Sequence, residues 1–549
     1  MFKSILKIFF LFLIISITKK SYSTEKNNFL ISTSHPMASK IGKEILNNGG
    51  NAMDAVVAVQ MALNLLEPES SGIGGGAFLL YYNKNNSKLY FYDGRETAPA
   101  NIKKEFFLDK EGNVLKFYDI AVGGLAIGVP GLVSLLDIAH KKHGSLNWSS
   151  LFVPSINLSK KGFKISDKLN KAITKDKFLY LFPESKDYFY QNNKPKKKEK
   201  IIKNANFLNT LNIISLKRSK GFYEGELAKD IVNSVKNSPI KNGYIELNDL
   251  KSYKAKQRNP LCGKYKKYKI CSAAPPSAGG FSILQILGIL EEFDLSKNKI
   301  KENIHLILEA AKFSYNDRYK YLGDPDFSSI KINKLLSKKY LKNISNEISK
   351  NKISDFTYNS QNETYIPTST THFSIIDKYG NIASITSSIE NTFGSRIMTN
   401  GFLLNNQLSD FNFKIKNNLY KNNIIEPLKR PLSSMSPTII FDENNNIRMV
   451  IGSPGGKSII MYVVKTIIAV LDWEMSIEEA VNFPNFSIYK NKILIEKDNF
   501  DKDFKEYLLN LGHLVVEKEL NSGLNGFEIK DKIIYGAADK RRNGLFIHN

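Results

Sequence analysis

Residues 370–389 read Thr-Thr-His-Phe-Ser-Ile-Ile-Asp-Lys-Tyr-Gly-Asn-Ile-Ala-Ser-Ile-Thr-Ser-Ser-Ile. Apolar or alternating residues at 373–376 and 382–389 flank turn residues at 377–381, so this stretch predicts a β-hairpin. Residues 350–369 before it are rich in Asn, Ser, Thr and Gln without an apolar period, which is typical of an exposed linker that proteases reach. A linker that enters a buried strand directly at a threonine is unusual, and it directs attention to Thr370.

Thr370 carries both a hydroxyl nucleophile and, if it became N-terminal, its own base. A free α-amine has an ordinary pKa of roughly 7.7–8.0, which suits a general base at working pH. The cut would follow Ser369: Thr370 Oγ attacks the Ser369 carbonyl, the acyl group moves from nitrogen to oxygen, and water hydrolyses the ester. His372 would share the face of Thr370 on a regular strand, but nothing else marks it as a base, so we interpret it as structural. Taken alone, the threonine pair is better explained as a β-rich strand start, and other motifs are needed to support the nucleophile.

The rest of the chain predicts helices around strands. Asn51 is expected to cap the second helix, and a glycine-rich loop, 452–456, connects a strand ending at Ile451 to a helix. Residues 160–215 are polar, lysine-rich and not assigned. Strands gathered in the second part of the chain favour stacked layers over a βαβ series. The expected helices are 35–47, 52–66, 130–140, 281–293, 304–321, 458–471 and 501–511, and the first strands are 77–82 and 89–92.

The composition is that of a folded chain with a strong basic excess. The 549 residues are 42% hydrophobic and 11% aromatic, with a formal net charge of +25. This excess fits either an anionic partner or general lysine enrichment, and the scattered lysines favour the second. The dense cluster at 194–200 is expected to be a solvated loop. Without zinc-finger spacing or a basic-aromatic RNA motif, we expect no nucleic-acid partner.

The N-terminus has the form of a secretory signal. Lys3 and Lys7 precede an apolar run at residues 8–17, and small residues follow near Ser23, so residues 1–23 are expected to be a signal peptide. The run is short for a membrane helix. The expected location is the periplasm or the exterior, and an uncleaved N-terminal membrane anchor is the alternative.

Cys262 and Cys271 are the two cysteines of the chain. If Lys266 and Lys267 form a two-residue turn, the cysteines face each other across a hairpin, and an exported protein could join them. The turn lacks Asn-Gly chemistry, so a disulfide and two unpaired thiols both remain open.

A set of motifs resembles the signatures of the γ-glutamyltransferase (γ-glutamyltranspeptidase) family, from about Ile31 to Gly544. They are residues 50–55 (GNAMDA), 71–76 (SGIGGG), 95–99 (RETAP), 321–325 (YLGDP), 370–372 (TTH), 404–407 (LNNQ) with 410–411 (DF), 430–438 (RPLSSMSPT) and 452–456 (GSPGG).

The resemblance implies the four-layer αββα sandwich of the N-terminal nucleophile hydrolases, an α+β fold. It also implies a cut between Ser369 and Thr370 into a large subunit, 24–369, and a small subunit, 370–549, which form one domain as a heterodimer. Thr370 would be the nucleophile and, through its amine, the base. Gly455 and Gly456 would bind the oxyanion through backbone N–H groups. Ser388 stands where the family often has a second threonine that contacts the nucleophile.

The resemblance also implies a site for a γ-glutamyl donor, which carries a free carboxylate and a free ammonium. Arg95 matches the carboxylate-binding arginine, helped by the hydroxyls of Ser433 and Ser434. Asp410, Gln407 and Glu390 match the ammonium-binding positions. Glu390 replaces an Asn of many members, so ammonium binding should strengthen at some cost in repulsion between carboxylates.

We therefore expect an enzyme that forms a γ-glutamyl ester on Thr370 and passes the acyl group to water or to an amino-acid or peptide amine. Glutathione or another γ-glutamyl compound would be the donor, without metal or organic cofactor. The stretch 411–429 departs from the family's lid, which leaves open whether Tyr420 is a lid residue. The alternatives are a cephalosporin-type acylase of the same family that takes a glutaryl group, and a non-catalytic exported binding protein.

Overall fold

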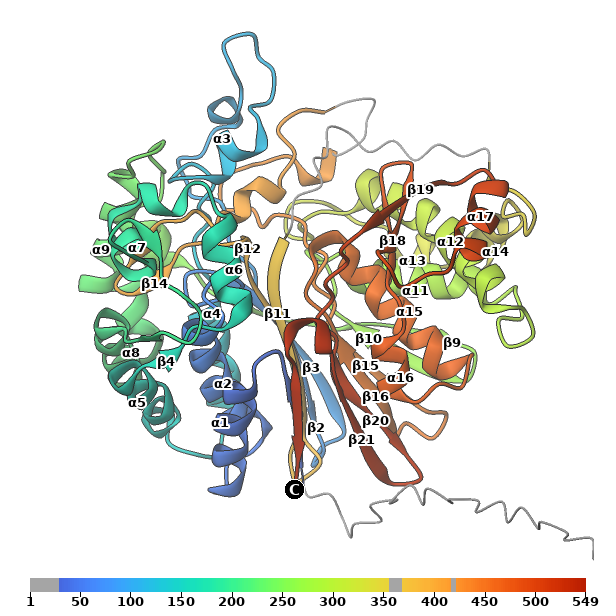
Figure 1. Cartoon of the computed structure of the whole chain (residues 1–549), viewed down its shortest axis with the longest axis horizontal. Coiled ribbons are helices and arrows are strands. Elements are labelled where there is room, and N and C mark those ends of the chain that lie inside the picture. The colour runs from blue at the N-terminus through green and yellow to red at the C-terminus, as the bar shows by residue number, and fades with distance from the viewer. Residues whose placement is uncertain (1–28, 355–367, 416–420) are drawn as a thin grey trace, which may run out of the picture.

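Two β-sheets face each other between two layers of helices (Figure 1). The computed structural model describes residues 29–354, 368–415 and 421–549. One sheet has the order β22 (Leu545–His548), β1 (Leu30–Thr33), β11 (Thr368–Ile376), β12 (Ile382–Asn391), β2 (Gly76–Asn83), β3 (Lys88–Gly94) and β8 (Lys256–Arg258). The other has the order β21 (Ile533–Ala538), β20 (Asn525–Lys530), β16 (Ile447–Gly452), β15 (Thr438–Phe441), β10 (Tyr268–Ser272) and β9 (Leu261–Tyr265).

The two sides of each strand belong to different cores, because successive side chains of a strand point to opposite faces. In β2, Ala77 and Leu79 join the core beneath the first helical layer, whereas Phe78 and Leu80 join the core that includes the second sheet. Both faces of the strand are therefore apolar, as expected for a strand in the middle of four layers.

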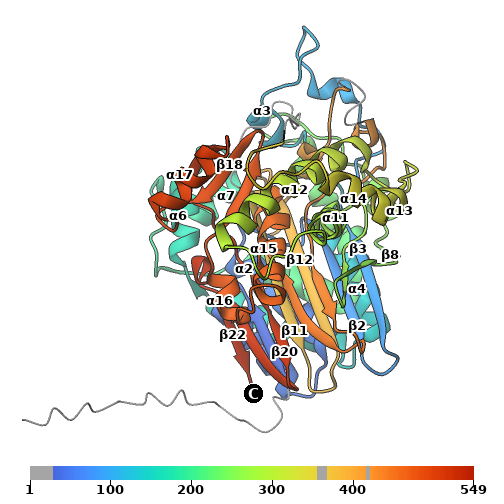
Figure 2. The same cartoon turned by 90° about the vertical axis from the view of Figure 1, so that its right-hand side faces the viewer.

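The outer helices pack on these cores. The first sheet is covered by α1 (Pro36–Asn47), α2 (Ala52–Leu66) and α4 (Leu132–His143), and α5 (Val153–Lys161) and α8 (Ala205–Tyr223) pack on the outside of α2 and α4. The second is covered by α11 (Gly279–Leu290), α12 (Ile300–Tyr321), α15 (Ile459–Leu471) and α16 (Ile477–Asn482), and Figure 2 shows this layer facing the viewer. The predicted four-layer αββα sandwich is confirmed.

Most predicted elements appear within a few residues of their expected limits. The helix at 52–66 is α2, and Asn51 caps it in a reciprocal capping box with Asp54. The helix expected to begin at Pro130 begins at Leu132, since Gly131 occupies the N-cap. The helix expected at 501–511 is α17 (Lys502–Asn510).

The unassigned region 160–215 is largely helical. It contains α6 (Asp167–Lys175), α7 (Pro183–Phe189) and most of α8. In α6 only Leu169 and Ile173 are buried, one helical turn apart. Its apolar residues have helical spacing, but they are few and lie in a short segment rich in lysine, so the sequence alone did not assign it. The cluster at 194–200 has only the two-residue β6 (Lys194–Pro195) and is mostly exposed, as expected of a loop.

The remaining elements are short. They include α3 (Phe117–Ala121), α9 (Glu226–Lys236), α10 (Leu247–Ser252), α13 (Ile332–Leu335), α14 (Lys338–Ser345) and a small sheet of β17 (Phe486–Tyr489), β18 (Lys492–Glu496) and β19 (Leu514–Lys518).

Cys262 and Cys271 form a disulfide across the β9–β10 hairpin. They are paired directly in the strand register, with Cα atoms 4.1 Å apart. Of the two possibilities left open by the sequence, the structure therefore has the bonded one.

Candidate active site

Thr370 lies near the start of β11, on the side that faces the second sheet. On the same side, Ser374 donates a hydrogen bond to the Asn525 carbonyl of β20, whereas Phe373 and Ile375 pack beneath the helices. β11 continues through Ser369 and Thr370 without a break, so the geometry is that of the uncut chain.

His372 is fully buried two residues further along the strand. Its ring nitrogens lie 2.8 Å from Thr386 Oγ1 and 3.1 Å from Ser374 Oγ. Burial lowers the pKa of His372 to about 3, so the ring is neutral. These contacts fit a structural role, because both nitrogens are occupied by side chains of the sheet.

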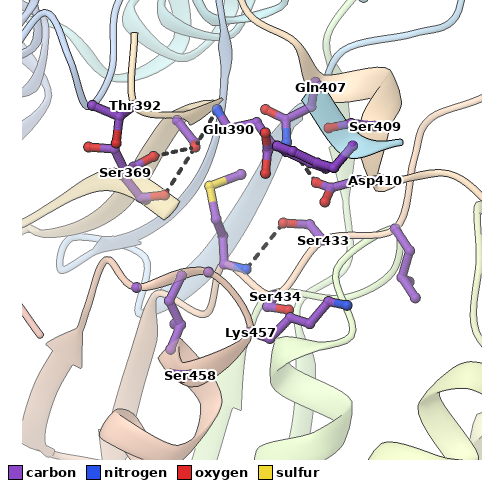
Figure 3. Close-up of a pocket in the computed structure, with 18 of the residues that line it drawn as sticks. Ser369, Glu390, Thr392, Gln407, Ser409, Asp410, Ser433, Ser434, Lys457 and Ser458 are labelled. Atoms are coloured by element: carbon purple, nitrogen blue, oxygen red, sulfur yellow. Dashed lines mark hydrogen bonds between the residues drawn. The ribbon is translucent and has the colours of Figure 1, made fainter. Parts of the chain in front are cut away.

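Ser388 of β12 connects the expected nucleophile to the expected cleavage point. Its hydroxyl donates to the Ser369 carbonyl at 3.1 Å and accepts from the Glu390 backbone N–H at 3.0 Å. Thr370 Oγ1 lies 3.0 Å from Ser388 Oγ. Because the single proton of Ser388 is used on the carbonyl, Thr370 is the donor in that contact. Figure 3 shows Ser369 and Glu390 on neighbouring parts of the pocket wall.

The glycine loop lies at the same end of the sheets. Gly455 and Gly456 have φ values of +131° and +56°, which favour glycine over other residues. They lead through a short 3₁₀ turn into α15. Backbone N–H groups at such a helix start attract negative charge, as an oxyanion site requires.

Arg95 and Asp410 form an ion pair in the same cavity. Arg95 Nη2 lies 2.6 Å from Asp410 Oδ2, while the guanidinium also donates to the carbonyls of Pro431 and Leu432, each at 3.0 Å. The side chain of Arg95 is only 1% exposed. Two fixed carbonyls thus hold the guanidinium in place before any ligand arrives.

Glu390 and Gln407 complete an acceptor-rich wall beside Asp410 (Figure 3). Gln407 donates to Asp410 at 2.7 Å, and its own Oε1 is buried without a hydrogen-bond partner among the described residues. Glu390 has a φ of +77° and accepts from Asn406 Nδ2. Burial, followed by repulsion from Asp410, raises the pKa of Glu390 to about 8.

One cavity of about 720 Å³ contains all of the predicted site residues. Its lining includes Ser369, Thr370, Ser388, Gly455, Gly456, Arg95, Glu390, Gln407, Asp410, Ser433 and Ser434. They come from segments far apart in the sequence. Their individual roles remain predictions, and Tyr420 lies outside the described residues.

The cavity also has lining residues that the sequence did not single out. Arg542 donates to the Thr370 carbonyl at 3.0 Å, and Lys168 lies beside the residues that precede the glycine-rich motif at 71–76. Lys457 directly follows the glycine pair in the sequence, so its position next to this motif could have predicted that it lines the cavity. For Arg542 and Lys168, no local pattern points to the site.

A separate group of metal-binding residue types is formed by two residues of α12, His305 and Glu309, and by His513. His305 and His513 are in contact at 2.8 Å between ring nitrogens, with Glu309 close by. Glu309 is bonded to the Lys312 ammonium and accepts from the backbone and hydroxyl of Ser354. Its carboxylate oxygens are thus engaged by protein donors, and we assign no metal to this group.

The family model for Gamma-glutamyltranspeptidase matches residues 38–548. The chain belongs to this family. It is 35% identical over 543 residues to the glutathione hydrolase proenzyme of Bacillus subtilis strain 168, covering 94% of this chain and 91% of that protein.

One solved structure supports the family assignment, and a second one supports the fold. Helicobacter pylori gamma-glutamyltranspeptidase is 37% identical, with a TM-score of 0.55, over 59% of this chain and 92% of that one. A cephalosporin acylase from Bacillus halodurans has a TM-score of 0.84 over 97% of this chain and 99% of that one. Its sequence is only 22% identical, so this similarity supports the fold alone.

The expected family, its αββα fold and its class of hydrolase and transferase enzyme are therefore confirmed. Within residues 29–354, 368–415 and 421–549, no helix has both the length and the apolar character needed to cross a membrane. The expected signal peptide lies outside these ranges.

Proposed function

We propose that this chain is an exported γ-glutamyltransferase and glutathione hydrolase that cuts itself between Ser369 and Thr370. The observation that carries the substrate class is the facing pair Arg95 and Asp410, in one cavity with Thr370. A γ-glutamyl group has a carboxylate and an ammonium on one carbon, and this pair offers one opposite charge to each.

Donor binding exchanges this internal ion pair for two new ones. The donor carboxylate takes the Arg95 fork and the hydroxyls of Ser433 and Ser434. Its ammonium takes Asp410, with Glu390 and the unpartnered Gln407 Oε1 as further acceptors. Each charge then has a partner, as buried charges require.

The acyl step follows from the position of Thr370. After the cut, its amine takes the proton of its own hydroxyl, and Oγ attacks the γ-carbonyl of the donor. The N–H groups of Gly455 and Gly456 receive the oxyanion. The nitrogen of the broken γ-amide takes up the proton held by the Thr370 amine and leaves as an amine, and water or an amino-acid or peptide amine then attacks the γ-glutamyl ester on Thr370.

The cut itself uses the same hydroxyl. In the uncut chain Thr370 donates to Ser388, which in turn polarises the Ser369 carbonyl that Thr370 must attack. The products would be the subunits 24–369 and 370–549, after loss of a signal peptide on the way to the periplasm or the exterior.

Hydrolysis of matched γ-glutamyl and glutaryl anilides tests the substrate class. A glutaryl group takes Arg95 but leaves Asp410 without its ammonium, and a lost bond to a charged group costs about 1.5–3 kcal/mol. We therefore expect a preference of about 10- to 100-fold for the γ-glutamyl compound, reduced in Asp410→Asn. A preference for the glutaryl compound would identify the acylase alternative instead.

Denaturing gel electrophoresis of the purified protein tests maturation. The expected result is two bands, with N-terminal sequencing of the smaller one beginning at Thr370, and a single uncut band for Thr370→Ala. An active enzyme that stays as one unbroken chain would refute the proposal, and an inactive unbroken chain would support a binding protein.

A further inference from the structure

Lys168 is the centre of a polar cluster behind the peptide that we propose is cut. Its ammonium lies 2.6 Å from Glu67 Oε1, 2.9 Å from Glu69 Oε1 and 2.9 Å from Ser70 Oγ. The two carboxylates are 3% and 2% exposed, and Lys168 is 24% exposed. Two buried carboxylates around one lysine are costly to desolvate, so their position beside the cut requires a reason.

This cluster holds the residues on both sides of Thr370. On the N-terminal side of Thr370, the Ser369 hydroxyl donates to Ser70 Oγ at 2.9 Å. On the C-terminal side of Thr370, the Thr371 hydroxyl donates to Glu67 Oε2 at 2.9 Å. Lys168 contacts both Ser70 and Glu67, so one ammonium connects the two attachments.

The backbone between these attachments departs from the regular ladder. The pairing of β11 with β12 shifts between Thr368 and Thr370, which places an irregularity at Ser369. The carbonyl of Ser369 accepts from the Ser388 side chain, and the carbonyl of Thr370 accepts from Arg542. The segment is therefore fixed by side chains at the point where the cut is expected.

We propose that Lys168, through Ser70 and Glu67, positions the Ser369–Thr370 peptide for self-cleavage. This inference rests on the proposed cut. In that step Thr370 Oγ bonds to the Ser369 carbonyl carbon, the C–N bond breaks, and the nitrogen gains the proton that the hydroxyl loses. Water then splits the ester into a Ser369 carboxylate and a free Thr370 hydroxyl. Lys168 touches none of these atoms and is a positioning residue.

The charge of Lys168 also determines whether Glu67 can accept the Thr371 hydroxyl in ionised form. Burial acts to raise the pKa of Glu67, but Lys168 first, then the Ser34 hydroxyl and Arg542, outweigh it, so the pKa lies below its usual value. The other ionisable groups that face Glu67 are Glu69 and His35. Without Lys168, burial would dominate, and Glu67 would be neutral at low pH and ionised only as the pH rises.

The test follows precursor conversion with time on denaturing gels for three full-length variants. Lys168→Met is expected to slow conversion about 10²-fold, because misplacing reacting groups by about 1 Å costs on that order. Lys168→Arg keeps the charge and is expected to restore most of the rate. Lys171→Met is the matched control, since Lys171 is on the same helix, is 67% exposed and pairs with Asp167.

A pH series separates positioning from general damage. The ratio of the wild-type rate to the Lys168→Met rate is expected to fall as the pH rises, since Glu67 regains its charge in the variant. Folding is checked by thermal unfolding in a Thr370→Ala background. If Lys168→Met does not fold, Ser70→Ala decides, because it removes the attachment of Ser369 while Lys168 keeps its contacts with Glu67 and Glu69, and it is expected to slow conversion about tenfold.

Conversion of a folded Lys168→Met or Ser70→Ala precursor at the wild-type rate would overturn the inference, as would equal slowing by Lys171→Met. If the wild-type precursor is cut and Lys168→Met and Ser70→Ala are cut equally fast, the inference about Lys168 is wrong but the proposed self-cleavage is not affected. If the wild-type precursor is never cut, the proposed function fails as well.

Discussion

Replacing Ser388 by alanine should block maturation far more strongly than it weakens the fold. The Ser388 hydroxyl contacts both the Thr370 nucleophile and the Ser369 carbonyl in the uncut chain, at 3.0 and 3.1 Å. Its removal takes away a hydrogen-bond donor from the oxygen on which negative charge develops, and it takes away the acceptor that orients Thr370.

The expected magnitude follows from these two contacts. Loss of one donor to a developing oxyanion costs about 2.7–4 kcal/mol, or 10²–10³ in rate. The Glu390 N–H also loses its acceptor at 3.0 Å, and an unsatisfied buried donor costs about 1–3 kcal/mol of folding stability. Conversion should therefore slow by about 10²–10³, while the folded precursor persists with a lower melting temperature.

The assay is the time course of precursor conversion, with intact mass measurement of the products. Ser388→Thr keeps the hydroxyl and should convert within about tenfold of the wild type. Ser387→Ala is the matched control, because the neighbouring Ser387 hydroxyl is buried and has no hydrogen-bond partner among the described residues. Maturation of Ser388→Ala at the wild-type rate would refute the assignment of Ser388.

Three further results are expected from other residues of the structure. The KM for γ-glutamyl donors should fall as the pH rises through about 8, because Glu390 attracts the donor ammonium only when it is ionised. If the dependence of KM on pH is the same in Glu390→Gln as in the wild type, Glu390 does not cause it. Gly455→Ala should lower kcat at least about 10²-fold, because the added Cβ would lie 2.6 Å from the Tyr462 ring at a φ of +131° and would displace the oxyanion-binding N–H groups. The measurement is steady-state kinetics of the matured variant, and an unchanged kcat would contradict the role of Gly455. Replacing Cys262 and Cys271 by serine should cost about 2–3 kcal/mol of stability in denaturant unfolding while kcat stays unchanged, and an altered kcat would place the hairpin in the catalytic machinery.

Local signals were enough to predict much of the fold. Asn51 and Asp54 stand three residues apart at the start of an apolar run, and they form the capping box that begins α2. Alternation and turn residues likewise defined the hairpin that follows Thr370. In contrast, α6 is only nine residues long and buries only Leu169 and Ile173, so too few apolar residues marked it as a helix even though their spacing is helical.

The candidate site was predictable only where motifs carried it. The motif residues gather in one cavity, but Lys168 meets Glu67 over a separation of 101 residues and Arg542 meets Thr370 over 172. Such pairings are set by how strands and helices assemble, and no local sequence pattern encodes them. Nor does the sequence show that Glu390, which is not a glycine, adopts a positive φ beside Asp410.

The strand order has a consequence for the protein after maturation. In the first sheet, β22, β12 and all of β11 except its first two residues come from the part that begins at Thr370, while β1 and β2 come from the part before it, and β1 lies between β22 and β11. The two pieces are therefore interlocked, and neither retains a complete sheet without the other. A precursor that unfolds can refold as one molecule, whereas a matured enzyme that comes apart must reassemble from two chains, so its recovery from denaturant should depend on protein concentration.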